Sequence, residues 1–192
     1  MNSRSMPDSE QTIRKFLQGD EEAFTQLVRQ WESRIYNLAL RFLGNREDAQ
    51  DVAQETFLSV FRWARDLRDP GSFRAWVYRV ALNHCRARWR SRGREMPLEE
   101  SSAEPDGSEV ESPQGLLSQA DRDPVELRDL IQKAFMRLSE DHREAIILKE
   151  YLGLSLEEVA RVMECPLSTA KSRLYHGLRG VQRQLLRLGA RS

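Results

Sequence analysis

Apolar residues recur every three or four positions along most of this chain, which is the spacing that lines one face of an α-helix. Short polar residues and glycine mark where such stripes begin and end. Asp20 and Asn45 precede two stripes as helix caps, Gly44 ends the first of them, and Ser72 precedes a third. The helices predicted in this half span about 10–17, 21–43, 46–60 and 73–92. We predict no strand anywhere in the chain.

Helical spacing resumes in the last third of the chain after an interruption. The segment 93–124 is rich in proline, serine and acidic residues and poor in large apolar ones, so it cannot bury enough surface to order itself. Beyond it we predict helices over 125–138 and, capped by Ser139 and ended by Gly153, over 140–151. The pattern therefore predicts an all-α protein with two small helical domains, 10–92 and 125–188, joined by a flexible acidic linker at 93–124.

The stretch Leu156–Arg179 has the pattern of two short helices around a tight turn. Ser155 can cap the first helix with Glu158 as its capping-box partner, and Pro166 interrupts the chain before the second. Ala170, Leu174 and Leu178 are expected to face inward. This is a helix-turn-helix, whose second helix suits the DNA major groove. The residues left to face DNA are Thr169, Lys171, Ser172, Arg173, Tyr175 and His176. The simpler alternative is a helical core with a solvated basic face.

Charge is balanced overall, with 30 basic and 30 acidic residues, but it is arranged in blocks. Residues 62–94 contain ten basic and two acidic residues, and 161–191 contain seven basic residues and one acidic. The linker between them has nine acidic and two basic residues. Two basic blocks separated by an acidic one suggest two contacts with a polyanion.

Two polar surfaces stand out on the predicted N-terminal helices. We call Asp48, Asp51, Gln54 and Glu55 the acidic face, because they lie opposite the apolar stripe of their helix. An acidic face near a helix start is often merely solvated. The helix after Ser72 carries an arginine row with Trp76, Tyr78 and Trp89 interleaved, a combination that can grip phosphates and stack bases. The row consists of Arg74, Arg79, Arg86, Arg88, Arg90 and Arg92.

Other classes of protein are disfavoured. Two cysteines provide no disulfide framework, and the N-terminus has no signal-peptide pattern. No apolar run approaches membrane-spanning length, so we expect a cytoplasmic protein without membrane insertion. The three histidines are scattered, and no phosphate loop or nucleophile motif is present. We therefore expect no enzyme, no metal site and no cofactor.

Three motifs in order resemble one family. The runs DAQDVAQETF at 48–57, SFRAWVYRVALNHCR at 72–86 and STAKSRLYHGL at 168–178 resemble the extracytoplasmic-function sigma factors of bacterial RNA polymerase. The resemblance covers nearly the whole chain outside the linker and the termini. It implies a polymerase subunit that directs initiation at alternative promoters, with the N-terminal domain opening the −10 element and the C-terminal domain reading the −35 element.

The resemblance also implies partners and sites. The acidic face would dock on the β′ clamp helices of the polymerase core, the C-terminal domain on its β flap, and an anti-sigma factor would hold the protein inactive. The protein would associate with the nucleoid when active. The −10 strand would contact Arg65, Asp66, Leu67, Arg68, Arg79, Asn83 and Arg86. The −35 duplex would contact Thr169, Lys171, Ser172, Arg173, Tyr175 and His176.

The linker length is compatible with a tethered reader of two elements. Promoter elements about 25 base pairs apart are separated by about 85 Å. About 30 linker residues reach at most roughly 100 Å, yet as a free coil they average only about 30 Å. The two domains can therefore span a promoter only if the polymerase holds the linker extended.

Departures from the family pattern fall in the helix-turn-helix. Glu164 and Ser168 stand where glycine is frequent, and a left-handed Glu164 would cost on the order of 1 kcal/mol. His176-Gly177 replaces a common Arg-Ala pair, so the preferred −35 sequence should differ. A stand-alone helix-turn-helix regulator is the alternative function. It would bind duplex DNA specifically without polymerase, but it leaves the acidic face and the arginine row unexplained.

Overall fold

The structure is a computed structural model that describes residues 7–63, 67, 69–93 and 124–189. The described residues are helical with short turns, and they include no strand, as the sequence predicts. Of the predicted linker 93–124, residues 94–123 lie outside this range, as do the loop residues Arg65, Asp66 and Arg68. Gly93 ends one helix and Pro124 begins the next. No helix in the described ranges is long and apolar enough to cross a membrane.

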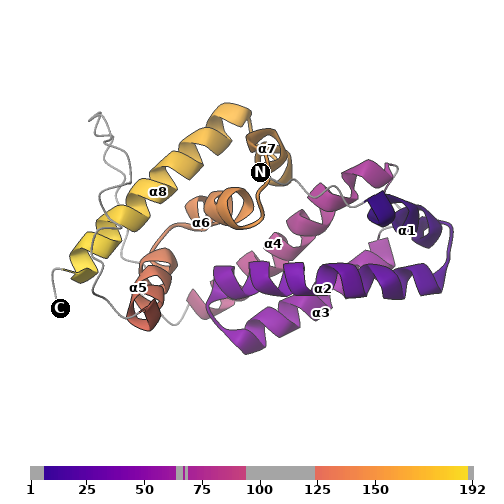
Figure 1. Cartoon of the computed structure of the whole chain (residues 1–192), viewed down its shortest axis with the longest axis horizontal. Helices are drawn as coiled ribbons and strands as arrows, with labels where there is room; N and C mark the ends of the chain where they lie inside the picture. Colours follow the sequence, from indigo (N-terminus) through magenta and orange to yellow (C-terminus); the bar gives the residue numbers. More distant parts are fainter. Residues whose placement is uncertain (1–6, 64–66, 68, 94–123, 190–192) are drawn as a thin grey trace.

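In the described part of the N-terminal half, helices α2, α3 and α4 lie side by side and α1 packs on the start of α2 (Figure 1). Asp20 accepts a hydrogen bond from the Ala23 amide at 3.1 Å, and Asn45 accepts one from Asp48 at 3.0 Å. Gly44 ends α2 with φ 70°. These three caps are confirmed. The elements are α1 (Pro7–Leu17), α2 (Glu21–Leu43), α3 (Arg46–Trp63), the 3₁₀ turn η2 (Pro70–Ser72) and α4 (Phe73–Gly93).

The C-terminal half carries the helix-turn-helix. The capping box of Ser155 and Glu158 is present in both directions, whereas Ser139 makes no side-chain cap. The predicted 140–151 helix changes after Ile146 into one π-helical turn, and Gly153 follows with φ 65°. The elements are α5 (Pro124–Met136), α6 (Glu140–Ile146), η4 (Ile147–Tyr151), α7 (Leu156–Val162) and α8 (Leu167–Gly189). The segment 181–188 continues α8.

Several orientations differ from the helical pattern. Tyr78 is 2% exposed, packed edge-on to Trp31, and not on the outer side of α4. Leu178, predicted to face inward, is 40% exposed, because the buried side of α8 at this level runs through Gly177 and Gly180, which closely approach α6 and the turn before it. Ser72 hydrogen-bonds to Asp69 at 2.7 Å, and Asp69 caps the turn that leads into α4.

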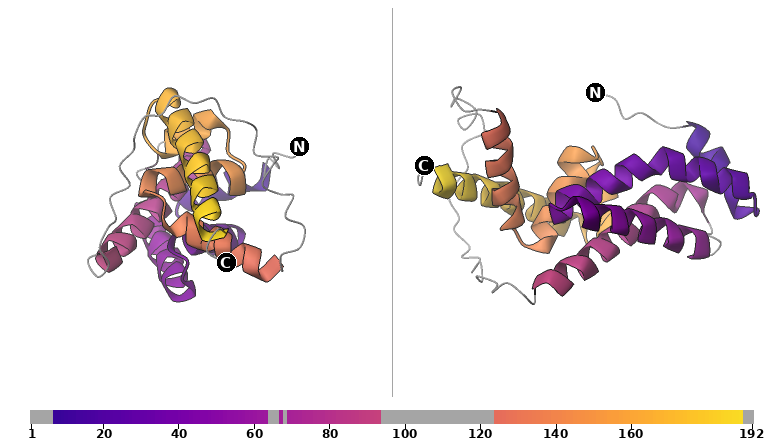
Figure 2. Two further views of the ribbon diagram at one scale, coloured as in Figure 1. Left: turned by 90° about the vertical axis from the view of Figure 1, so that its left-hand side faces the viewer. Right: turned by 90° about the horizontal axis from the view of Figure 1, so that it is seen from below.

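The two halves pack against each other. Figure 2 shows α6 and α7 between α8 and the helices of the N-terminal half, and α4 contacts α7 while the end of α2 contacts α5 and η4. Arg143 of α6 is fully buried at this junction and donates to the carbonyl oxygen of Phe42 at 2.9 Å. Its guanidinium also lies 4.0 Å from the ring centre of Trp89. The halves therefore form one body in this structure.

Candidate functional site

The acidic face lies on α3 and is held by arginines of the neighbouring helix. Arg88 of α4 lies 3.2 Å from a carboxylate oxygen of Asp51 and 3.1 Å from one of Glu55. Arg92 lies 2.6 Å from Asp48. Two members of the arginine row thus neutralise part of the acidic face. Because both arginines cover it, Asp48 is only 6% exposed, which corrects its predicted place on an open surface.

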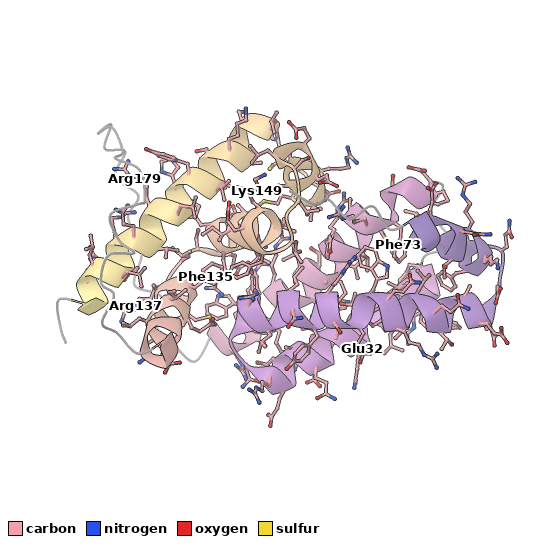
Figure 3. The ribbon with its side chains drawn as sticks, in the orientation of Figure 1. Glu32, Phe73, Phe135, Arg137, Lys149 and Arg179 are labelled. Atoms are coloured by element: carbon pink, nitrogen blue, oxygen red, sulfur yellow. The ribbon has the colours of Figure 1, made fainter. Side chains whose placement is uncertain are left out.

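An apolar groove borders the acidic face, and the sequence pattern did not reveal it. It has a volume of about 1080 Å³ and lies between α2 and α3. Leu58 and Phe61, which line it, are 55% and 49% exposed. Gln54 belongs both to this groove and to the acidic face. Glu32, another lining residue, lies on the side of α2 turned away from α6 and α8 (Figure 3).

The residues predicted to hold a −10 strand are partly engaged within the molecule. Arg79 lies 2.5 Å from Glu164 and donates to the carbonyl oxygen of Arg161 at 2.9 Å. Arg86 donates to both carboxylate oxygens of Glu144 at 2.5 Å and to Asn83 at 2.9 Å. Arg79 and Arg86 are thus engaged by the C-terminal half in this structure, whereas Asn83 is exposed. Their contact with a −10 strand stays a prediction. Leu67 is half-buried against the core.

Glu144 and Arg143 place opposite charges in the interior. The side chain of Glu144 is 0% exposed, and burial raises its pKa while the hydrogen bond from Arg86 acts against that rise. The same hydrogen bond raises the pKa of Arg86. Burial lowers the pKa of Arg143 to about 10, so its guanidinium remains charged at neutral pH. Its second terminal nitrogen donates to the carbonyl oxygens of Met136 and Leu138, both at 3.0 Å.

The helix-turn-helix has the geometry that its sequence indicates. Glu164 adopts a left-handed φ of 51° in the turn. This agrees with its position, at which the family frequently has glycine. Lys149 of η4 donates to the carbonyl oxygen of Leu154 at 3.2 Å and braces the approach to α7 (Figure 3). At the front of α8, Lys171, Ser172, Tyr175 and His176 are exposed and Thr169 is half-buried.

Two of the predicted −35 contacts also touch α6. Arg173 lies 2.6 Å from Asp141 and is 27% exposed at its side chain. The rings of His176 and His142 lie 6.2 Å apart between centres, and Tyr175 packs edge-on to His176 at 5.5 Å. Burial, followed by the charge of His176, lowers the pKa of His142. α6 therefore positions this part of the recognition helix.

One trio of side chains has the residue types of a hydrolytic triad. Ser59 lies 3.0 Å from Nε2 of His84, whose Nδ1 lies 3.2 Å from Glu55. Ser59 is in the interior of α3, where backbone amides already bond the preceding turn, so they cannot form an oxyanion hole beside it. Among the described residues, no group of three or more histidine, cysteine or acidic side chains could hold a metal ion. The expectation that no cofactor is used stays a prediction.

Comparison with known proteins accounts for both halves. Residues 27–95 match the family model of sigma-70 region 2, and residues 117–179 match that of sigma-70 region 4. The RNA polymerase sigma-H factor of Pseudomonas aeruginosa is 33% identical over 180 residues, which cover 92% of this chain and 93% of that protein. This chain belongs to the extracytoplasmic-function sigma factors. The sigma-E factor of Escherichia coli K12 is 30% identical over 90% of this chain and 92% of its own length.

Solved structures agree on the fold of this sigma factor. CnrH in complex with the cytosolic domain of CnrY has a TM-score of 0.68 at 22% identity, covering 92% of this chain and 96% of that one. The sigma factor RpoE of Bartonella quintana, in complex with the anti-sigma factor NepR, has a TM-score of 0.61 at 27% identity, covering 84% and 96%. These likenesses confirm the all-α architecture with two helical domains.

The family defines the protein's role. It is an alternative sigma factor that directs promoter-specific transcription, and its family consists of initiation factors, not enzymes. The stand-alone regulator considered from the sequence would explain the region 4 match alone. The match to region 2 accounts for the N-terminal half, which such a regulator leaves without a role.

Proposed function

We propose that this sigma factor docks the RNA polymerase core through the acidic face and the adjoining groove of α2 and α3. The observation that carries the proposal is that one surface joins acidic side chains to an open apolar groove. An amphipathic helix with a cationic edge fits such a surface, because its apolar face fills the groove while its charges meet Asp51 and Glu55. The β′ clamp helices are the proposed occupant.

The same proposal assigns the promoter contacts. The loop 65–68 and the outer side of α4, with Arg79, Asn83 and Arg86, hold the non-template −10 strand. The exposed front of α8 enters the major groove of the −35 element, where lysine, serine and tyrosine side chains can reach phosphates and base edges. The C-terminal half binds the β flap. The domain limits 10–92, 93–124 and 125–188 belong to this proposal.

We extend the proposal to regulation and location. Two solved proteins similar in fold are in complexes: the sigma factor RpoE with the anti-sigma factor NepR, and CnrH with the cytosolic domain of CnrY. An anti-sigma factor is accordingly the proposed inhibitor of this chain. The protein acts in the cytoplasm and associates with the nucleoid once bound to polymerase.

Run-off transcription with purified core polymerase and a library of genomic upstream fragments tests the docking surface. Asp51→Arg with Glu55→Arg should abolish the sigma-dependent starts, because two attractive charges become repulsive. Leu58→Arg should do the same by placing a cation in the groove, and its 55% exposure makes it compatible with folding. Glu22→Arg, a charge reversal in the first turn of α2, is the matched control. Full transcription by the α3 variants would contradict the proposed docking site.

A further inference from the structure

Four arginines of α4 pair with glutamates of the C-terminal half. The distances are 3.4 Å for Arg74–Glu158, 2.5 Å for Arg79–Glu164, 2.5 Å for Arg86–Glu144 and 3.1 Å for Arg90–Glu140. We call these glutamates the glutamate surface and their partners the outer arginines. The other two members of the arginine row, Arg88 and Arg92, pair instead with α3. One set of α4 arginines thus contacts the C-terminal half and the other set contacts α3.

The outer arginines have the dimensions of a nucleic-acid track. From Arg74 to Arg90 the helix rises about 24 Å at about 1.5 Å per residue. That length matches about seven stacked nucleotides at about 3.4 Å each. Carboxylates meet the guanidinium fork in the same bidentate way as phosphate oxygens do, and Arg86 binds Glu144 in this way. The glutamate surface therefore presents to α4 the chemistry that a DNA strand would present.

Two of the four ion pairs, Arg79–Glu164 and Arg90–Glu140, are partly exposed and therefore open easily. Arg90 is 69% exposed at its side chain and Glu164 is 65% exposed, and exposed ion pairs contribute little to stability. Glu144 is different, because it is buried and would need Arg86 or water to keep its charge. Opening hydrates the glutamates and releases the outer arginines together. A competing polyanion can then take their place.

We propose that the glutamate surface is an internal phosphate mimic that occupies the outer arginines of α4 and excludes single-stranded DNA from them until the two halves separate. The proposal rests on the proposed role of α4 in holding the −10 strand. It adds that the C-terminal half, besides reading the −35 element, is the occupant of the strand-binding surface in the free protein.

The test compares two double variants of the full chain that lose the same charge. Glu140→Gln with Glu164→Gln weakens two partly exposed pairs of the interface. Glu150→Gln with Glu157→Gln removes two exposed glutamates of the C-terminal half that have no pair with α4, and Glu157, like Glu140, lies in the first turn of a helix. The measurements are fluorescence anisotropy with a mixed-sequence 12-nucleotide single-stranded DNA, without polymerase, and the radius of gyration from small-angle X-ray scattering.

We expect the interface variant to bind the oligonucleotide about 3- to 10-fold more tightly than the control variant and to have the larger radius of gyration. Equal DNA affinity and equal size for the two variants would overturn the proposal. Expansion without tighter binding would also overturn it, and would place the failure in the strand-binding role of α4, not in the contact between the halves. Circular dichroism of each variant establishes that the helices are intact.

Discussion

Replacing Gly177 by alanine tests how closely α8 must approach α6. A Cβ atom at this position would lie 3.0 Å from the carbonyl oxygen of His142, 3.0 Å from Cδ1 of Ile146 and 3.2 Å from Cβ of His142. The carbonyl oxygen and the Cβ atom of His142 are fixed to the backbone of α6, so neither can move away unless the helix itself shifts. His142 also contacts His176 of the recognition helix, so the same strain would reach the predicted DNA-facing surface.

Two effects of opposite sign decide the stability of Gly177→Ala. Alanine gains about 0.8–1.0 kcal/mol over glycine within a helix. Overpacking a close contact costs about 1–3 kcal/mol when backbone must shift. Over most of its range the cost of overpacking exceeds the helical gain. We therefore expect the free energy of unfolding to fall by about 1 kcal/mol.

Gly180→Ala is the matched control on the same helix. Its Cβ would meet only Cδ2 of Leu138, at 2.7 Å, and a leucine end can rotate for about 0.5–1.5 kcal/mol. That cost is close to the helical gain, so this variant should have nearly the stability of the original protein. Urea unfolding followed by circular dichroism measures both. If Gly177→Ala were as stable as Gly180→Ala, the argument that α6 restricts the approach of α8 would be wrong.

Three other predictions concern side chains with distinct environments. His176→Arg should change the preferred −35 sequence by adding a guanine-reading guanidinium worth roughly 1–3 kcal/mol at one base pair, and equal relative activities across a −35 promoter library would contradict this. The pKa of His142 is lowered on folding, so below about pH 6.5 the unfolded chain binds more protons than the folded one and the free energy of unfolding should decrease. His142→Asn should therefore show a smaller difference between its urea midpoints at pH 7 and pH 5.5 than the original protein does. Burial raises the pKa of Cys85, so a thiol reagent at pH 8 should modify half-buried Cys165 first in the native protein, and mass spectrometry showing Cys85 modified first would refute this.

Local chemistry made the helices predictable. A helix cap needs one short polar side chain close to one backbone amide, so Asp20, Asn45 and the Ser155–Glu158 box were visible in the sequence. Ser139 shows the limit of the same rule, because its side chain makes no cap bond. The π-helical turn after Ile146 was also missed. A π-helix has hydrogen bonds between residues five apart instead of four. Over a single turn this hardly changes the spacing of the apolar residues, so the sequence pattern does not distinguish it from an α-helix.

The candidate sites were predictable in composition but not in partners. A helical pattern assigns Asp48 and Arg86 to polar faces, yet it cannot say which other helix covers those faces. Two arginines from α4 bury Asp48. The carboxylate of Glu144, from α6, accepts two hydrogen bonds from the guanidinium of Arg86. The groove beside Leu58 was missed because it is formed jointly by α2 and α3. The sequence pattern of one helix alone cannot predict a groove that two helices form together.

The sequence by itself determined the helices, the helix-turn-helix and the family, because each depends on side chains within about one or two turns of one another or on ordered motifs. Only the tertiary structure decided that the outer arginines of α4 meet the glutamates of α6, α7 and the following turn. These pairs join residues 50 to 85 positions apart in the sequence. Their charges were plain in the sequence, but opposite charges have many possible partners until packing brings one of them within reach.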